Sequence, residues 1–135
     1  MYDSASTGTT GMIFLVDNGG NTNFEVQNSA GFAQGYATET NPQGVWTATR
    51  TAAAVLDMYK NGSSTSRKNG TSTSTSPATG VPFFIGARNT GGTPDNFTGD
   101  QIAIVAFGSG LTGVNAAQLH TDLNTYMTAL GTNVY

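Results

Sequence analysis

Short apolar runs, each closed by glycine and asparagine, set the strongest limit on the fold of this chain. Gly11–Asp17 is apolar with a β-branched and aromatic bias, and the turn-forming residues Asn18-Gly19-Gly20-Asn21 follow it. Val55–Lys60 is a similar run, and Asn61-Gly62, a strong hairpin signal, closes it. Runs of this length with turn signals about every 8–12 residues predict antiparallel strands.

The other predicted strands are 24–27, 32–38, 45–50 and 81–87. Gln101–Phe107 is apolar at both odd and even positions, so we expect a central strand that is covered on both faces. The predicted loops are 39–44, 63–80 and 89–96. The Ser/Thr-rich loop 63–80 is either a long loop or a solvated hairpin tipped at Asn69-Gly70.

One helix is predicted, near the end of the chain, from about Gly113 to Leu130. Thr112 is suited to the N-cap and Gly131 to the C-terminal stop. Apolar residues recur in it at steps of three and four and form one stripe: Ala116, Leu119, Leu123, Tyr126, Met127 and Leu130. The sequence therefore predicts an all-β antiparallel sandwich, with this helix laid across its edge or end.

The length fits a single domain over residues 1–135, either complete or as the C-terminal part of a larger domain or polypeptide. Charged residues make up only 10% of the chain, against about 25% in ordinary soluble domains. Surfaces rich in hydroxyl and amide groups are typical of extracellular and virion proteins, so we expect one of these two locations.

Composition also argues against several classes of function. The five basic residues are scattered, so the basic stripe needed for tight nucleic-acid binding is missing. The absence of cysteine excludes disulfides, thiolate metal sites and cysteine nucleophiles. Neither Met12–Val16 nor any other apolar run in the chain is long enough to span a bilayer, so we expect no membrane insertion.

Three stretches follow one another in a familiar pattern. Val55–Gly62 is a strand with tyrosine, a basic residue and Asn-Gly, Phe83–Asn89 contains an Ile-Gly step, and Phe97–Thr112 leads through Leu-Thr into a terminal helix. In this order they resemble laminin-G-like and concanavalin A-like domains, and the last stretch is similar to domains encoded by bacteriophages and prophages. The resemblance covers about residues 45–131. It implies a concanavalin A-like jelly-roll β-sandwich that binds glycans or proteins, often in a virion.

The chain departs from that family in having few strands before its first hairpin. Domains of this kind usually begin with several more. Either the chain is a compact version of the fold, or it is a piece whose N-terminal strands lie elsewhere, for example on a neighbouring subunit. An unpaired sheet edge is an assembly surface. The expected partners are therefore other virion or cell-surface subunits, including further copies of the chain, and glycans.

Groups suited to catalysis are sparse. His120 is the only histidine, and its place beside the apolar stripe indicates a half-buried helix residue. Glycoside hydrolysis needs two carboxyl groups about 5–5.5 Å or 6.5–9.5 Å apart, whereas the only glutamates, Glu25 and Glu39, are distant in sequence. The Glu-x-Asp-x-x-Glu strand of the laminarinase branch is absent. We therefore expect no enzyme, with a glycoside hydrolase relative as the least favoured alternative.

No cofactor is expected, and calcium is the alternative. The weak calcium candidates are Asp17, Asp95 and Asp100, whose carboxylates border predicted turns and are the hard oxygen ligands that Ca²⁺ prefers. Aspartate is also an ordinary turn-forming residue. The three residues therefore have a structural explanation as well.

The candidate ligand-binding residues combine aromatic rings with hydrogen-bonding side chains. They are Trp46, Arg50, Tyr59, Arg88, Asn89, Asn96 and Phe97. A sugar ring stacks on an aromatic face, while arginine and asparagine bond its hydroxyl groups; alternatively, Trp46 and Tyr59 belong to the core. We predict a non-enzymatic structural or adhesion module of a phage virion, such as a tail, fibre or capsid-surface protein. The alternative is a dedicated carbohydrate-binding lectin module whose loops 39–44, 63–80 and 89–99 form the sugar site.

Overall fold

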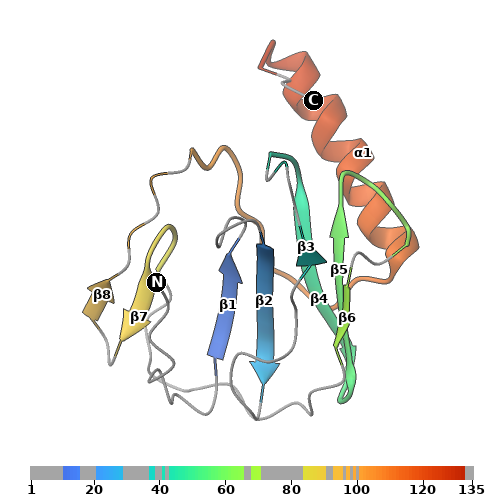
Figure 1. Cartoon of the computed structure of the whole chain (residues 1–135). Coiled ribbons are helices and arrows are strands. Elements are labelled where there is room, and N and C mark those ends of the chain that lie inside the picture. The colour runs from blue at the N-terminus through green and yellow to red at the C-terminus, as the bar shows by residue number, and fades with distance from the viewer. Residues whose placement is uncertain are drawn as a thin grey trace.

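The computed structural model describes residues 11–15, 21–28, 37–38, 41, 43–65, 68–70, 84–90, 93–95, 97, 99 and 101–132 (Figure 1). The elements in these residues are β1 (Gly11–Leu15), β2 (Asn21–Asn28), β3 (Ala37–Thr38), β4 (Trp46–Ala52), β5 (Val55–Lys60), β6 (Lys68–Gly70), β7 (Arg88–Thr90), β8 (Thr93–Asp95) and α1 (Gly113–Ala129). None of the described helices is long and apolar enough to cross a membrane.

The described strands form three small antiparallel sheets. Their orders are β1-β2-β3, β4-β5-β6 and β7-β8, so every ladder joins strands that are consecutive in the chain. The predicted pairing of the first two strands is confirmed, since Phe14 of β1 lies opposite Phe24 of β2. A jelly roll instead needs Greek-key ladders between strands that are distant in sequence. The prediction of an all-β jelly-roll β-sandwich is therefore wrong.

The segment 101–107 is central to this correction. It was expected to be a central strand covered on both faces, yet it belongs to no sheet and each of its residues is exposed. An apolar run indicates that a segment is suited to burial, but the run does not specify which strand pairs with it. Local pattern predicted the hairpins, whereas the long-range pairing that a sandwich requires is not encoded locally.

The β4–β5 hairpin is covered on both of its faces. Leu56 and Met58 are fully buried, and Trp46 and Ala48 pack against them on the first face. On the second face, Thr49, Asp57 and Tyr59 are 4%, 9% and 7% exposed. Because side chains alternate between the faces of a strand, burial of four consecutive residues of β5 places neighbouring layers on both sides.

The turn after β5 forms as predicted. Asn61 and Gly62 have φ values of 50° and 71°, and Ser63 N donates to Lys60 O over 3.1 Å. Positive φ at both central residues is the pattern of a type I′ turn. Asn61 also lengthens the β4–β5 ladder, since its N donates to Val45 O and its Oδ1 accepts from Val45 N, both over 2.9 Å.

The helix begins and ends close to the predicted residues. Thr112 is the N-cap, and its side chain accepts a hydrogen bond from Asn115 N over 3.3 Å. Gly131 follows the helix with φ of 69°, and its N donates to Thr128 O over 3.0 Å. These boundaries were predictable because both caps depend on residues adjacent in sequence.

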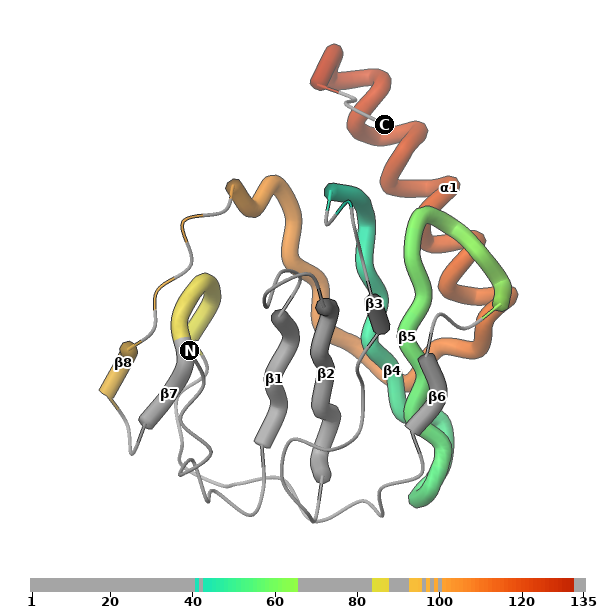
Figure 2. Tube along the Cα trace, viewed as in Figure 1, coloured from blue at the N-terminus to red at the C-terminus, as the bar shows by residue number. Residues whose placement is uncertain are grey.

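The first half of α1 lies beside β5 and the β5–β6 connection (Figure 2). Leu111 N donates to Thr49 Oγ1 over 2.6 Å, which ties the segment before the helix to β4. A methyl group at Gly113 would lie 2.2 Å from Ser64 O and 3.2 Å from the Tyr59 ring. The helix start and the β5–β6 connection are therefore in close contact.

The second half of α1 projects beyond the hairpin (Figure 1). Of the predicted apolar stripe, Ala116 is buried and Leu119, Leu123 and Met127 are half-buried, whereas the other two members are exposed. Those two are Tyr126, 57% exposed, and Leu130, 55% exposed. Burial of the stripe is thus deepest at Ala116, near the start of the helix.

Residues 84–95 differ from the prediction. Phe84–Ala87, expected to be a strand, has no strand pairing, and the expected loop after it contains the β7–β8 hairpin. Pro94 is tolerated in β8 because an edge strand does not need every N–H for its ladder. The prediction missed the signal of Gly91-Gly92 between Thr90 and Thr93, which favours a two-residue hairpin connection.

The Ser/Thr-rich region is also corrected. Lys68–Gly70 forms β6, in which Asn69 lies opposite Asp57 of β5 and Gly70 lies opposite Leu56. The alternative that placed a hairpin tip at Asn69-Gly70 is wrong, because both residues are within a ladder.

Candidate binding surface

Trp46 and Lys60 form a cation–π pair at one end of the β4–β5 hairpin. The two residues are directly opposite each other, and Lys60 Nζ lies 4.9 Å from the centroid of the indole ring. Lys60 Nζ also donates to the carbonyl oxygen of Asn41. Trp46 is half-buried and packs against the Leu56–Met58 cluster. The lysine and the core thus cover parts of the ring on which a sugar was expected to stack.

Arg50 is on the same face as Trp46 but near the other end of β4. Four residues separate the two, or about 13 Å at roughly 3.3 Å per residue. Arg50 Nη1 donates to Ala53 O over 2.6 Å, which holds the guanidinium against the β4–β5 turn. Burial lowers the pKa of Arg50 from its ordinary value. A ligand that touched both Trp46 and Arg50 would have to span most of the strand.

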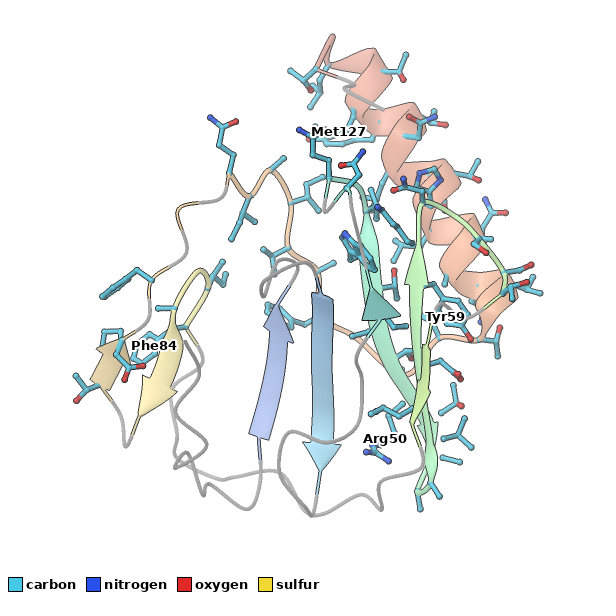
Figure 3. All side chains as sticks on the ribbon, viewed as in Figure 1. Arg50, Tyr59, Phe84 and Met127 are labelled. Carbon is cyan, nitrogen blue, oxygen red and sulfur yellow. The ribbon has the colours of Figure 1, made fainter. Side chains whose placement is uncertain are left out.

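Tyr59 is on the opposite face, toward α1. Figure 3 shows Tyr59 on the helix side of the hairpin and Arg50 on the other side. Burial raises the pKa of Tyr59, and the negative charge of Asp57 and the hydrogen bond between the two side chains raise it further. The phenol is therefore held as a neutral donor to Asp57. The structure separates Tyr59 from Trp46 and Arg50, although the sequence grouped them.

The second group of candidates is near the β7–β8 hairpin. Arg88 is opposite Asp95 in the ladder, and Asn89 is opposite Pro94. Phe97, two residues after β8, is 73% exposed. Ligand contact at these residues stays a prediction. Asn96 lies outside the described residues.

Residues that could bind a metal ion are dispersed in the part of the chain that the structure describes. No three histidine, aspartate or glutamate side chains gather there in a way that could hold a metal ion. Asp17 and Asp100 lie outside the described residues, as does Glu39, so calcium binding stays a prediction. His120 is half-buried, as expected, and lies beside Gly62, where an added methyl group would be 2.7 Å from its Nδ1.

The sequence prediction did not identify the apolar surface of Ile102–Phe107, which we name the 102–107 segment. Four of its side chains are large and exposed: Ile102, Ile104, Val105 and Phe107. The exposed fractions range from 40% for Ile104 to 61% for Phe107. The signal was present as an uninterrupted apolar run, but it was interpreted as burial within the same chain. Burial against another molecule has the same sequence pattern.

Comparisons with protein-family models, with curated proteins and with solved structures found no match to this chain.

Proposed function

We propose that this chain is a non-enzymatic structural or adhesion module that assembles with other protein subunits. The observation that supports it is the exposed 102–107 segment. Contiguous exposed apolar surface is uncommon on soluble monomers and marks interaction sites. Its four large side chains are 40–61% exposed in the isolated chain, so a partner that covers them gains the transfer free energy of the area still exposed.

The chemistry of the segment supports a protein partner. Residues 101–113 contain no charged side chain, and the core of a protein–protein interface is depleted in charge. The chain as a whole has only 10% charged residues, which is unsuited to binding a polyanion. Other subunits, including copies of this chain, therefore fit the surface better than a nucleic acid does.

A virion is the setting we favour, on sequence grounds. The low charge and the resemblance of residues 97–112 to phage-encoded domains support it. The assembly proposal does not require a jelly roll, because it depends on exposed apolar residues and not on the number of sheets.

The proposal is tested by measuring what the chain binds. The proteins encoded beside it are co-expressed with a tagged form, and complexes are weighed by light scattering against the 13.9 kDa monomer. Complexes that weaken with Ile104→Asp but not with Val114→Asp, an exposed position on α1, are the expected result. A chain that remains monomeric and binds none of these proteins would overturn the proposal.

Carbohydrate binding is the second candidate, and the exposure of Phe97 favours it. An aromatic ring that is 73% exposed is open to a sugar face. A glycan array tests this function, with Phe97→Ala as the variant and Val114→Ala as the matched control. Binding to a defined glycan that Phe97→Ala abolishes would support a lectin, whereas an array without signal would exclude it.

A further inference from the structure

We propose that a second copy of this chain pairs with the 102–107 segment as an antiparallel β-strand, across a twofold axis through Ile104. This inference rests on the proposed function and names the partner. It adds a specific surface and a specific register to the general expectation of assembly.

The segment has the properties of a strand without a sheet. Isoleucine, valine and phenylalanine are favoured in strands, and they make up four of the six residues of this segment, the other two being alanine. Among the described residues, no backbone hydrogen bond is found for 101–106. Pairing with another strand would satisfy these backbone groups and cover the side chains at the same time.

The charges that flank the segment permit a second copy to pair with it in the antiparallel orientation. Asp100 precedes it, and the next charged residue in the sequence is Asp122. A parallel, in-register pair would place the two Asp100 residues side by side, and like charges directly opposite each other are destabilising. An antiparallel pair centred on Ile104 places them eight residues apart, or about 26 Å at roughly 3.3 Å per residue. Antiparallel self-pairing therefore carries no charge penalty.

Symmetry selects the register. A twofold axis perpendicular to a sheet maps each side chain onto the same face of the sheet. Residues that lie directly opposite each other therefore differ by an even number of positions. The axis must then pass beside one residue and not between two. Centring on Ile104 pairs Ile102 with Ala106 and Ala103 with Val105, so a large side chain meets a small one in each case. A centre one residue earlier would bring Asp100 into the ladder opposite Ala106. A centre one residue later would place Ile102 opposite Gly108.

The size of the surface determines the strength of the contact. Four partly exposed side chains supply a few hundred Å², whereas a standard interface buries roughly 800 Å² on each partner. The pair should therefore form reversibly and depend on concentration. Side chains elsewhere on the exposed surface would add to the contact only where the twofold axis brings them together.

Crosslinking tests the register directly, because the chain contains no cysteine. Ile104→Cys places two thiols opposite each other, with Cβ atoms about 4.5–5.5 Å apart, close to the spacing that a disulfide needs. The control Ala103→Cys places its thiols on a diagonal, about 7–8 Å apart. Under mild oxidation we expect Ile104→Cys to form a covalent dimer about tenfold faster than Ala103→Cys or Val114→Cys, because only its thiols are opposed. A mixture of Ala103→Cys and Val105→Cys should give the crosslinked heterodimer.

Equal crosslinking rates at 103, 104 and 114 would overturn this inference. So would a wild-type chain that remains monomeric at every concentration, as measured by sedimentation. If that monomer still bound proteins encoded beside it, the proposed function would stand while the self-pairing failed. Circular dichroism of each variant confirms that the fold is retained.

Discussion

Gly113 gives the most direct test of how the helix docks, because two physical effects oppose each other there. It is the first residue of α1, and a methyl group added to it would lie 2.2 Å from Ser64 O. Helix propensity alone predicts that Gly113→Ala stabilises the protein, by up to about 1 kcal/mol. Close packing against the β5–β6 connection predicts the reverse.

The magnitude follows from the contact distance. Ordinary van der Waals contact begins at 3.4 Å, so the separation from Ser64 O must grow by 3.4 − 2.2 = 1.2 Å. The clash is with a backbone atom, so it cannot be relieved by rotating a side chain. Overpacking of this kind costs about 1–3 kcal/mol, which exceeds the gain in helix propensity. With the full gain of about 1 kcal/mol set against this cost, we expect a net destabilisation of up to about 2 kcal/mol.

Denaturant unfolding, followed by circular dichroism, measures the change. Gly108→Ala is the matched control, since no atom lies within 4 Å of its added methyl group. That variant should be unchanged or stabilised by about 0.4–1 kcal/mol through the unfolded state. If Gly113→Ala raised the midpoint as much as Gly108→Ala does, then the start of the helix would not lie against Ser64, and the docking described above would be wrong.

Three further predictions concern the two faces of the hairpin. Met58→Ala should destabilise the fold by about 2–5 kcal/mol, as expected for a fully buried side chain. An unchanged denaturation midpoint would show that the Met58 side chain lies outside the core. Thr49→Val keeps the shape of the side chain but removes the oxygen that accepts a hydrogen bond from Leu111 N. We expect the free energy of unfolding to fall by about 1–3 kcal/mol and hydrogen exchange at the Leu111 amide to become faster. Unchanged exchange at that amide would contradict the contact. Tyr59 has a raised pKa, so its stabilising contribution is present below the ordinary value of about 10 and is lost as pH rises through the higher folded-state value. Tyr59→Phe should therefore show a smaller fall in unfolding free energy above about pH 10 than wild type, and equal slopes would refute this reasoning.

Features that depend on neighbouring residues were predictable. The bounds of β5, the Asn61-Gly62 turn, the Thr112 cap and the Gly131 stop each follow from φ preference or from a hydrogen bond to a nearby residue. The same holds for the pairing of β1 with β2, which are close in the chain. In each case the sequence contains both partners of the interaction within a few residues.

Features that depend on distant residues were not predictable. The contact between Leu111 and Thr49 joins residues 62 positions apart, and no local pattern indicates it. The separation of Trp46 from Tyr59 depends on the β4–β5 register, which places Trp46 opposite Lys60 and Thr47 opposite Tyr59. A shift of one residue in that register would have placed both aromatic rings on one face.

The arrangement of the hairpin explains why the interaction surface should be sought elsewhere. On one face of β4–β5 the side chains of Leu56 and Met58 are fully buried, and on the other face the start of α1 lies against Tyr59. A ligand that used Tyr59 would have to displace the helix, and with it the Leu111 hydrogen bond to Thr49. The 102–107 segment immediately precedes the residues that make these contacts, so its position is fixed at one end while its apolar side chains remain exposed. An exposed segment anchored in this way loses less conformational entropy on pairing than a free tail would, which favours it as the site of assembly.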